Sequence, residues 1–392
     1  MRSFIDRFKF FLFFLFKVKI KLKLPKKNKL IFFDCQRRAD TEILLKKYKY
    51  FGLKTRLESI DEIYLNIKII KYFFIYYKGS IKLAYLSAII HFIKPKLILT
   101  FIDNSIIFSE LAKIFYPRIN FAAIQNGRRF DAIKIRKKLF IPNFFCFGNF
   151  DIYFYKKYKI KVNNFYPYGS LRLSNFIVRN KNFLSKKIFL YDICFIADAL
   201  INDHVREVGV KNTDINEIKL VKYIVRYCIK NKLKLVVLYK DENDKKSLFV
   251  LKRFIKKNLS NSEYSFFTNS LERKIYKNTK NYYKLNSYKI IYSSRVLCSS
   301  FSTMLLEKIA FRQKILACNF TGSKIFDFPD KGICSLKKCS FSFFEKRLTK
   351  IYNLTDTNYF KQIKKKKNYS IFFDKNCSTI KLIQDKIDEF LQ

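Results

Sequence analysis

The sequence predicts an α/β protein made of two Rossmann-like domains that face each other across a cleft. Short apolar segments of strand length alternate with stretches of helical periodicity, which is the pattern of parallel α/β sheets. The alternation runs from residue 29 and starts again near residue 191, after a segment rich in Lys, Asn and Ser. A chain of 392 residues is long enough for two domains with separate cores.

The composition indicates a folded chain with a strongly positive electrostatic field. Hydrophobic residues make up 49% and aromatic residues 18%, which argues against extensive disorder. Lys and Arg number 80 against 31 Asp and Glu, a formal net charge of +49. This charge favours nucleotide sugars, phospholipid headgroups or nucleic acid as partners. Heavy use of Lys, Asn, Ile, Phe and Tyr is also typical of AT-rich coding, which lowers the weight of the charge as a functional signal.

The nine cysteines are scattered along the chain without a C-x-x-C pair. Several lie inside apolar runs, where a reduced and buried thiol is the ordinary state. The sequence therefore predicts a reducing compartment, with neither a disulfide framework nor a zinc site.

Residues 1–28 form a basic and aromatic segment. Its uninterrupted apolar run, Phe10–Phe16, is far shorter than the ~20 residues of a membrane-spanning helix, and no signal-peptide cleavage site follows. Lysines then alternate with apolar residues up to Pro25. We predict that this segment lies on an anionic membrane surface, which places the protein in the cytoplasm, peripheral on the inner face of the plasma membrane. The alternative is an N-terminal element packed on its own domain.

Residues 29–172 are predicted to form the N-terminal, acceptor-side domain. Strands are expected at 29–34, 53–56, 96–102 and 119–125, and helices at 39–50 and over most of 61–94. Asp103 follows one of these strands, at the sheet edge where α/β proteins bind ligands. It is a candidate general base for an acceptor hydroxyl, or else the cap of the helix that starts near Ser105.

The strand at 119–125 runs into a polar turn that contains Gln125, Asn126, Gly127, Arg128 and Arg129. Gly127 permits a positive φ or a close backbone approach. The two arginines are suited to bidentate binding of a phosphate or a sugar carboxylate. The alternative is an ordinary strand turn with solvated arginines.

A linker is predicted at 173–188, a donor-nucleotide domain at 189–370 and a C-terminal helix within 371–392. Strands are expected at 193–198, 233–239, 264–268, 290–297 and 314–318, and helices at 215–230, 242–256, 343–352, 358–367 and 379–391. Lys240, at the end of a strand, is a candidate phosphate ligand or part of a solvated charge run. Of the two histidines, His91 is expected to be structural and His204 lies in a polar loop that faces the cleft.

A cluster of hydroxyl residues separates the strand at 290–297 from the helix after it. The cluster contains Ser299, Ser300, Ser302 and Thr303, and Glu307 follows on the helix one turn after Thr303. A turn of this kind directs backbone N–H groups, the positive end of a helix dipole and several hydroxyls at one spot, which suits a phosphate. A serine-capped helix with an exposed glutamate is the alternative.

The segment SSFSTMLLEKIAFRQKIL resembles the donor-nucleotide loop of GT-B glycosyltransferases, in particular those of bacterial surface-carbohydrate biosynthesis. It is more distantly similar to sialyl- and Kdo-type transferases and to the glycerophosphotransferases of wall teichoic acid. This resemblance covers most of residues 29–390. It implies that the hydroxyl cluster holds the nucleotide phosphate and that Glu307 lies near the ribose.

Two segments of the first half resemble the same families. The turn after residue 124 is similar to their (I)Q-(H/N)-G-x-R motif, but Asn126 stands where many relatives have His, and an amide cannot act as a general base. Residues 148–172 are similar to a G-x-x-D-x-x-x-Y…x-G-S-x-R pattern. The resemblance implies that Gly169 and Ser170, followed by Arg172, lie at the cleft where the chain leaves the first domain.

The sequence therefore predicts a GT-B glycosyltransferase that moves a sugar from a nucleotide-sugar donor to a cell-surface polysaccharide or lipid-linked glycan acceptor. With two histidines and no Asp-x-Asp motif, we expect neither a metal nor another cofactor. One alternative is a phosphotransferase of the teichoic-acid type that uses a CDP-alcohol. The other is a basic nucleic-acid-binding protein, but the charge is spread over the chain rather than clustered among aromatic residues, so no nucleic-acid partner is expected.

Overall fold

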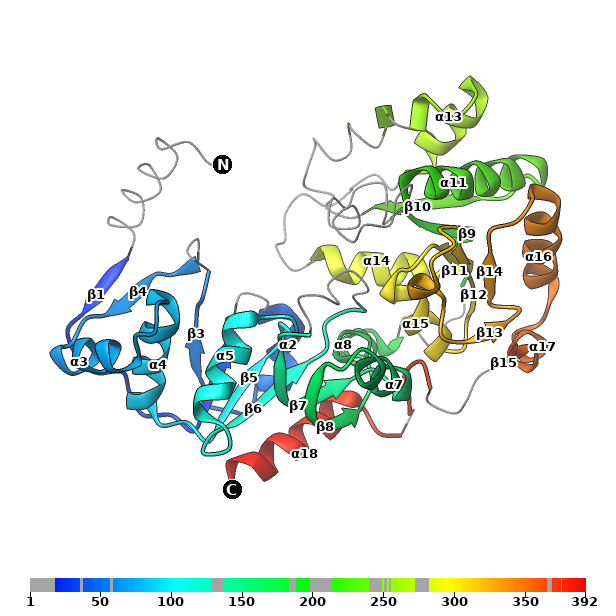
Figure 1. Ribbon diagram of the computed structural model, residues 1–392. Helices are drawn as coiled ribbons and strands as arrows, with labels where there is room; N and C mark the ends of the chain where they lie inside the picture. The colour runs from blue at the N-terminus through cyan, green and yellow to red at the C-terminus, as the bar shows by residue number, and fades with distance from the viewer. Residues whose placement is uncertain are drawn as a thin grey trace.

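The computed structural model describes residues 18–35, 38–56, 59–128, 137–182, 188–197, 213–239, 249, 252–253, 255–271, 282–364, 369–374 and 376–392 (Figure 1). These residues include two parallel sheets, of six and five strands, with helices packed around them. The sheets belong to two Rossmann-like domains, which confirms the predicted fold class. In Figure 1 the six-stranded domain lies at the lower left and the five-stranded domain at the upper right.

The six-stranded sheet has the order β3-β2-β5-β6-β7-β8, and all its pairs are parallel. Its strands are β2 (Leu30–Phe33), β3 (Phe51–Leu53), β5 (Leu97–Thr100), β6 (Asn120–Ile124), β7 (Phe140–Cys146) and β8 (Lys161–Pro167). Its helices are α2 (Arg38–Leu45), α3 (Ile67–Tyr76), α4 (Ile81–Ile93), α5 (Ile106–Phe115), α7 (Asn149–Lys157) and α8 (Leu171–Arg179). All four residues of β2 are buried, as expected of a strand with both faces covered.

The five-stranded sheet has the order β10-β9-β11-β12-β14 and is also parallel. Its strands are β9 (Tyr191–Ala197), β10 (Leu235–Tyr239), β11 (Ser294–Ser299), β12 (Lys314–Asn319) and β14 (Ser335–Lys337). The surrounding helices are α11 (Thr213–Lys230), α13 (Asn261–Asn269), α14 (Tyr282–Tyr292), α15 (Thr303–Ala310), α16 (Phe341–Asn353) and α17 (Asp356–Lys361). A short helix, η3 (Lys324–Phe326), and an antiparallel pair, β13 (Lys331–Gly332) with β15 (Ile363–Lys364), complete this domain.

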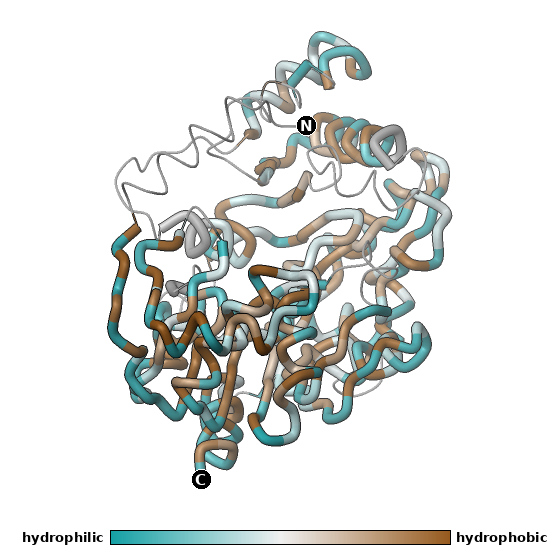
Figure 2. The backbone as a smooth tube through the Cα atoms, turned by 60° about the vertical axis from the view of Figure 1, so that its left-hand side comes forward, coloured by the Kyte–Doolittle hydropathy of each residue, from teal (hydrophilic) through white to brown (hydrophobic). Residues whose placement is uncertain are grey.

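Apolar side chains of the described residues pack into three clusters. One fills the second domain, and the other two lie on opposite faces of the first sheet, because successive residues of each strand point to opposite sides. Figure 2 shows hydrophobic stretches running through the interior of the molecule, whereas many outer turns are hydrophilic. All nine cysteines have free thiols, and seven of them are buried.

Two strand predictions in the second half are wrong. Residues 264–268 belong to helix α13, because Ser260 and Glu263 form a capping box that starts a helix there. The predicted strand at 290–297 is divided: α14 continues to Tyr292, and β11 begins only at Ser294. Aromatic and β-branched residues misled both predictions, since these types are favoured in strands but pack equally well on a buried helix face.

Other boundaries also shift. The helix predicted at 39–50 ends at Leu45, and β3 lies at Phe51–Leu53 rather than at 53–56. The linker predicted from residue 173 begins within α8, where the Ser170 hydroxyl accepts a hydrogen bond from the Leu173 N–H and caps the helix. The predicted helix at 242–256 lies mostly outside the described residues.

The C-terminal helix α18 (Thr379–Leu391) packs on the first domain. Its residues Ile380, Ile383 and Ile387 are buried in the cluster that includes β2 and β5. The Tyr48 hydroxyl donates to Asp388 at 2.9 Å, which fixes the helix beside α2. The chain therefore returns to its first domain after completing the second (Figure 1).

The described part of the N-terminal segment packs on its own domain. Strand β1 (Lys19–Lys21) pairs in parallel with β4 (Glu62–Tyr64), as the alternative for residues 1–28 held. Residues 1–17, which carry the apolar run, lie outside the described residues. In the part of the chain that the structure describes, no helix is both long and apolar enough to cross a bilayer.

Candidate functional site

Both sheets reverse their strand order at one point. In the first sheet β3 is added on one side of β2 and β5 on the other, and in the second sheet β10 and β11 flank β9 in the same way. Ligands of open α/β sheets bind beyond the carboxyl ends of the strands at such switch points. Asp103 follows β5, and the Ser299–Thr303 segment, which we call the hydroxyl turn, follows β11. Both candidate groups therefore lie where this fold binds ligands.

The four hydroxyls of the hydroxyl turn differ in their contacts. Ser299 is fully buried and donates to the Ile196 carbonyl of β9 at 3.1 Å, so it joins two strands. The Ser302 hydroxyl caps α15 by accepting from the Met304 N–H at 3.4 Å. Among the described residues, none bonds to the Ser300 hydroxyl. Ser300 is 8% exposed, less than Ser302 and Thr303, but its hydroxyl is not engaged by the described protein groups and can therefore bond to a ligand.

The two rims of the cleft touch through Thr303. Its hydroxyl oxygen accepts a hydrogen bond of 3.0 Å from the Arg128 N–H, which joins the start of α15 to the turn after β6. A Cβ on Gly127 would lie 3.6 Å from that oxygen, so the small residue is set directly against the second domain. The close approach predicted for Gly127 is therefore present, whereas the positive φ is not. We call Gln125–Arg128 the facing turn.

The polar side chains of the facing turn bond within the first domain. Gln125 donates to Asp151 at 3.0 Å and accepts from the Phe147 N–H at 2.8 Å. Asn126 donates to the Phe101 carbonyl at 2.8 Å. These bonds fix the turn as a rigid part of the rim.

Asp103 is 2% exposed at the same rim. The helix cap that was its alternative role belongs to Ser105, whose hydroxyl accepts from the Phe108 N–H at 3.2 Å. Asp103 is therefore not the N-cap of α5, and its role as a general base stays a prediction.

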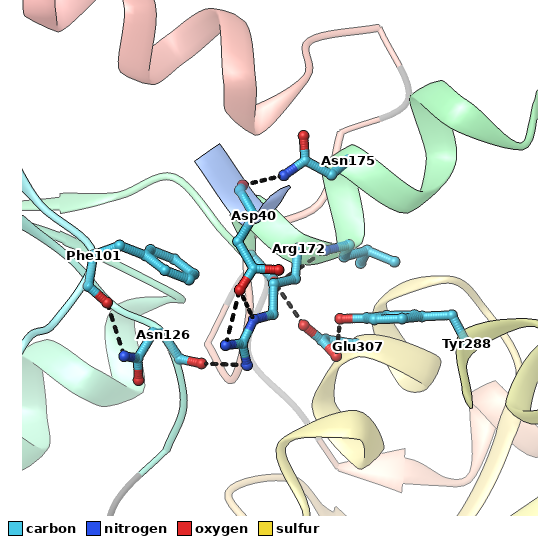
Figure 3. A network of polar contacts seen from close by, with 9 residues as sticks. Asp40, Phe101, Asn126, Arg172, Asn175, Tyr288 and Glu307 are labelled. Carbon is cyan, nitrogen blue, oxygen red and sulfur yellow. Dashed lines mark hydrogen bonds and ion pairs between the residues drawn. The ribbon is translucent and has the colours of Figure 1, made fainter. Parts of the chain in front are cut away.

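Arg172 joins three elements of the first domain (Figure 3). Its guanidinium donates to the Asp40 carboxylate of α2 at 3.2 and 3.3 Å and to the Asn126 carbonyl at 3.0 Å. The same group lies 5.3 Å from the centre of the Phe101 ring. Asn175, one turn later on α8, donates to the Asp40 carbonyl. Arg172 thus supports the facing turn from behind.

Glu307 is enclosed between the domains. It is 2% exposed, and its two carboxylate oxygens accept hydrogen bonds from the Ser170 hydroxyl and, at 2.8 Å, from the Tyr288 hydroxyl. Burial raises the pKa of the Glu307 carboxyl, against the effect of these two bonds and of Arg172. Figure 3 shows this carboxylate between Tyr288 and the Arg172 region. Contact with a ribose, which stays a prediction, requires the carboxylate to exchange one of these partners.

The Arg128 side chain packs against an aromatic ring of the first domain. Its guanidinium lies 3.9 Å from the centre of the Phe150 ring, near Asp151 and Asp330. Burial lowers the pKa of Arg128 to about 10, and the two nearby carboxylates limit the change. In this arrangement the side chain joins the domains, so binding of a sugar carboxylate or phosphate by Arg128 stays a prediction.

Gly169 lies where the chain crosses between the domains. Its φ is +92°, and a Cβ there would lie 2.5 Å from the Phe372 carbonyl oxygen. Only glycine fits this position without displacing the returning chain. Gly169 and Ser170 are therefore at the cleft, as the resemblance implies, but their contacts are with protein groups.

Comparison with known proteins bears on the fold. No family model matches the chain, and no curated protein matches it. A UDP-GlcNAc 2-epimerase of Methanocaldococcus jannaschii, solved with UDP-GlcNAc and UDP, has a similar structure: TM-score 0.51, 11% identity, 92% of this chain and 99% of that one covered. The UDP-GlcNAc 2-epimerase of Neisseria meningitidis aligns with TM-score 0.49, 11% identity and 95% and 99% coverage. The wall teichoic acid polymerase TagF aligns with TM-score 0.44, 9% identity and 100% and 99% coverage.

The chain has a GT-B fold. In a GT-B fold the two domains face each other through the carboxyl edges of their sheets, and here the bond between Arg128 and Thr303 joins those edges. At this level of identity the likeness establishes the fold alone.

Several predicted residues of the GT-B cleft lie outside the described residues. These are Lys240, Arg129 and His204. Among the described residues, no group of three or more His, Cys, Asp or Glu side chains is arranged to hold a metal ion.

Three polar residues were not predicted from the sequence: two lie beside the cleft and one lies in the core of the second domain. Asp40, the partner of Arg172, lies in the first turn of α2, the helix that follows β2, so the strand-end rule that selected Asp103 would also have found it. Tyr288, the partner of Glu307, gives no signal in the sequence. Lys308 is fully buried and donates to the Ile291 and Ser294 carbonyls between α14 and β11; burial lowers its pKa to about 7.

Proposed function

We propose that this chain is a glycosyltransferase that moves a sugar from a nucleotide-sugar donor to a cell-surface polysaccharide or lipid-linked glycan acceptor, without a metal ion. The donor binds the second domain, residues 189–370, and the acceptor binds the first, residues 29–172. The protein works in the cytoplasm, peripheral on the inner face of the plasma membrane.

The observation that supports this function best is the bond between Thr303 and the Arg128 N–H, because it brings the carboxyl edges of the two sheets together. A donor at one switch point and an acceptor at the other would then lie within reach of each other. The structural neighbours include enzymes solved with UDP-GlcNAc or CDPG, which supports a nucleotide-linked donor.

The roles of the residues follow from their positions. The Ser300 hydroxyl and the N–H groups at the start of α15 stabilise the donor phosphate and the charge that develops on it as it leaves. Asp103 accepts the proton of the acceptor hydroxyl. The oxygen of that hydroxyl then bonds to the anomeric carbon of the donor sugar, and the bond from this carbon to the phosphate oxygen breaks. Arg172 positions the facing turn. Glu307 exchanges a protein hydroxyl for a ribose hydroxyl when the donor binds.

The test is a thermal-shift panel followed by product analysis. The full chain is heated with CMP-, UDP- and GDP-sugars and with CDP-glycerol, and any stabilising compound is then incubated with glycan acceptors. Binding at a hundredfold excess over Kd stabilises a protein by about 2.7 kcal/mol, which is a clear shift of the melting temperature. Sugar transfer with release of the nucleotide supports the proposal.

Other outcomes overturn it in distinct ways. Transfer of a phosphoalcohol from CDP-glycerol assigns the phosphotransferase alternative. A UDP-sugar recovered with inverted stereochemistry and no transfer assigns an epimerase. Stabilisation by DNA or RNA and by no nucleotide sugar, lost at high salt, assigns nucleic-acid binding.

A further inference from the structure

A large groove lies at the edge of the first domain, away from the cleft between the domains. It is formed by β3, β4, α3 and α4 and has a volume of about 1060 Å³. Most of its lining is apolar and includes Leu53, Ile63, Ile69, Phe73, Tyr85 and Leu86. Its volume is that of a site for a sizeable apolar ligand.

The rim of the groove exposes large apolar side chains. Ile67 is 75% exposed, and Phe74 and Ile81 are each 69% exposed. Ile67 and Phe74 belong to α3, whose sequence, IKIIKYFFIY, is apolar on more faces than the one that packs on α4, and Ile81 is the first residue of α4. Figure 2 turns this end of the molecule forward and shows hydrophobic stretches of chain there. Grouped exposed apolar residues of this size mark an interaction surface.

The charge around the groove is positive. Residues 63–93, which include α3 and α4, contain four lysines and no Asp or Glu, and Lys82 among them lines the groove. The acidic residues that line the groove, Asp61 and Glu62, are ion-paired with Lys54 and Lys21. An apolar surface that is surrounded by lysines without acidic neighbours is complementary to a bilayer with anionic headgroups. A protein partner with an apolar surface alone would leave these lysines unmatched.

The position of the groove fits the same occupant. Lys54 and Thr55 line it and follow β3, so it reaches the carboxyl edge of the sheet that also carries Asp103. Strand β1, which continues directly from the basic and aromatic residues 1–17, pairs with β4 beside the groove.

We propose that this groove binds the hydrocarbon chain of an anionic membrane lipid, with the exposed side of α3 on the bilayer surface. The inference goes beyond the proposed function, because it concerns a site outside the cleft and needs no donor. The lysines hold the lipid headgroup and the apolar lining receives the chain.

The absence of tryptophan from the chain allows a direct test. A Phe74→Trp variant of the full chain introduces one fluorophore at a position that is 69% exposed, so folding is preserved. The probe is a phosphatidylglycerol–phosphatidylcholine vesicle whose acyl chains are brominated. We expect a blue shift and loss of at least half of the fluorescence when vesicles are added, because bromine quenches only on close contact.

The matched control is Phe343→Trp, at an aromatic position 50% exposed on α16 of the second domain, which should be quenched little. Bound protein in which neither tryptophan is quenched, or both are quenched alike, would overturn the proposal, since residues 1–17 alone would then account for membrane binding. If no nucleotide sugar stabilises the protein in the thermal-shift panel, the proposed function fails, but the quenching result still decides whether the groove binds lipid.

A second variant measures the contribution of the rim. Ile81→Glu places a negative charge beside the lysines at another residue that is 69% exposed, and should reduce sedimentation with anionic vesicles at least tenfold. Phe343→Glu should leave sedimentation unchanged. If Ile81→Glu instead abolishes a concentration-dependent dimer and leaves vesicle binding intact, the face belongs to a second copy of the chain and the lipid site is refuted.

Discussion

Both rims of the cleft carry polar side chains just beyond the end of a strand, but they use these groups differently. On the first rim, Gln125, Asn126 and Arg172 all bond within the protein. On the second rim, Ser300 bonds to none of the described residues, and Ser302 makes one hydrogen bond of 3.4 Å to the backbone.

This difference separates residues that shape the site from residues that can contact a ligand. A side chain whose donors and acceptors are already paired contributes order, and removing it leaves buried partners unsatisfied. A hydroxyl that lies at a helix N-terminus and has no protein partner can bond to an anion without breaking a hydrogen bond inside the protein. We therefore expect the first rim to act mainly as a scaffold around Asp103 and the second to bind the donor.

The largest effect is expected at Asp103. Asp103→Asn keeps the shape of the side chain and removes the proton acceptor, so turnover should fall roughly 10²–10⁴-fold while donor affinity is unchanged. The measurement is kcat together with donor Kd by calorimetry. Ser105→Ala is the control: it removes the cap of α5 and should cost about 1 kcal/mol of stability without changing turnover. Full turnover in folded Asp103→Asn would remove this residue from the chemistry.

The second rim is tested by Ser300→Ala combined with Ser302→Ala. Each bond to a charged phosphate is worth about 1.5–3 kcal/mol, so nucleotide affinity should fall at least tenfold for each bond lost. Ser299→Ala is the matched control, because that hydroxyl is bonded to Ile196 and should contribute to stability rather than affinity. Equal affinity of the double variant and the wild type would contradict the phosphate assignment.

Breaking the scaffold of the first rim should change stability more than affinity. Arg172→Lys keeps the charge but loses the planar fork that joins Asp40 to the Asn126 carbonyl. Unfolding in urea should show a loss of about 1–3 kcal/mol, and kcat should fall because the facing turn is less fixed. Arg179→Lys, whose partner Glu42 is largely exposed, should change stability by less than about 0.5 kcal/mol. An unchanged free energy of unfolding in Arg172→Lys would show that the turn is held by other groups.

Much of the fold could be predicted because its signals are local. Buried strands such as β2 and β5 appear as short apolar runs, and the hydroxyl turn stands out by composition. The position of polar residues directly after predicted strands also located the ligand edge, since Asp103 and Ser299–Thr303 do lie at the two switch points.

The contacts that give these residues their roles could not be predicted, because they join distant parts of the chain. Glu307 was expected on an exposed helix face or near a ribose, but it meets Tyr288 and, 137 residues away, Ser170. Helix α13 was mistaken for a strand because its aromatic content outweighed its capping box. The spacing of apolar residues along the sequence indicates which face of an element is buried, but it does not indicate which distant residues cover that face.

The smallest effect is expected at Glu307, whose carboxyl is enclosed between the two rims, and it concerns the pH dependence of stability. Because burial raises its pKa, the folded protein holds this proton at pH values where the unfolded chain has lost it. Its contribution to stability is therefore full below the unfolded pKa and is lost as pH rises through the folded one. Glu307→Gln removes this dependence while keeping a side chain that bonds to Ser170 and Tyr288.

At pH 8 the Glu307→Gln variant should melt about 1–2 °C above the wild type, a difference of about 1 kcal/mol in a protein of this size, and the gap should close as the pH is lowered towards 4.5. Glu42→Gln, at a side chain that is 64% exposed, is the control and should show no such trend. If the melting temperature of the wild type instead rises relative to that of the variant as the pH rises, Arg172 and the hydroxyls of Ser170 and Tyr288 stabilise the ionised carboxylate more than burial destabilises it. Glu307 would then act as a charged clamp between the rims rather than as a buried acid that a ribose hydroxyl can release.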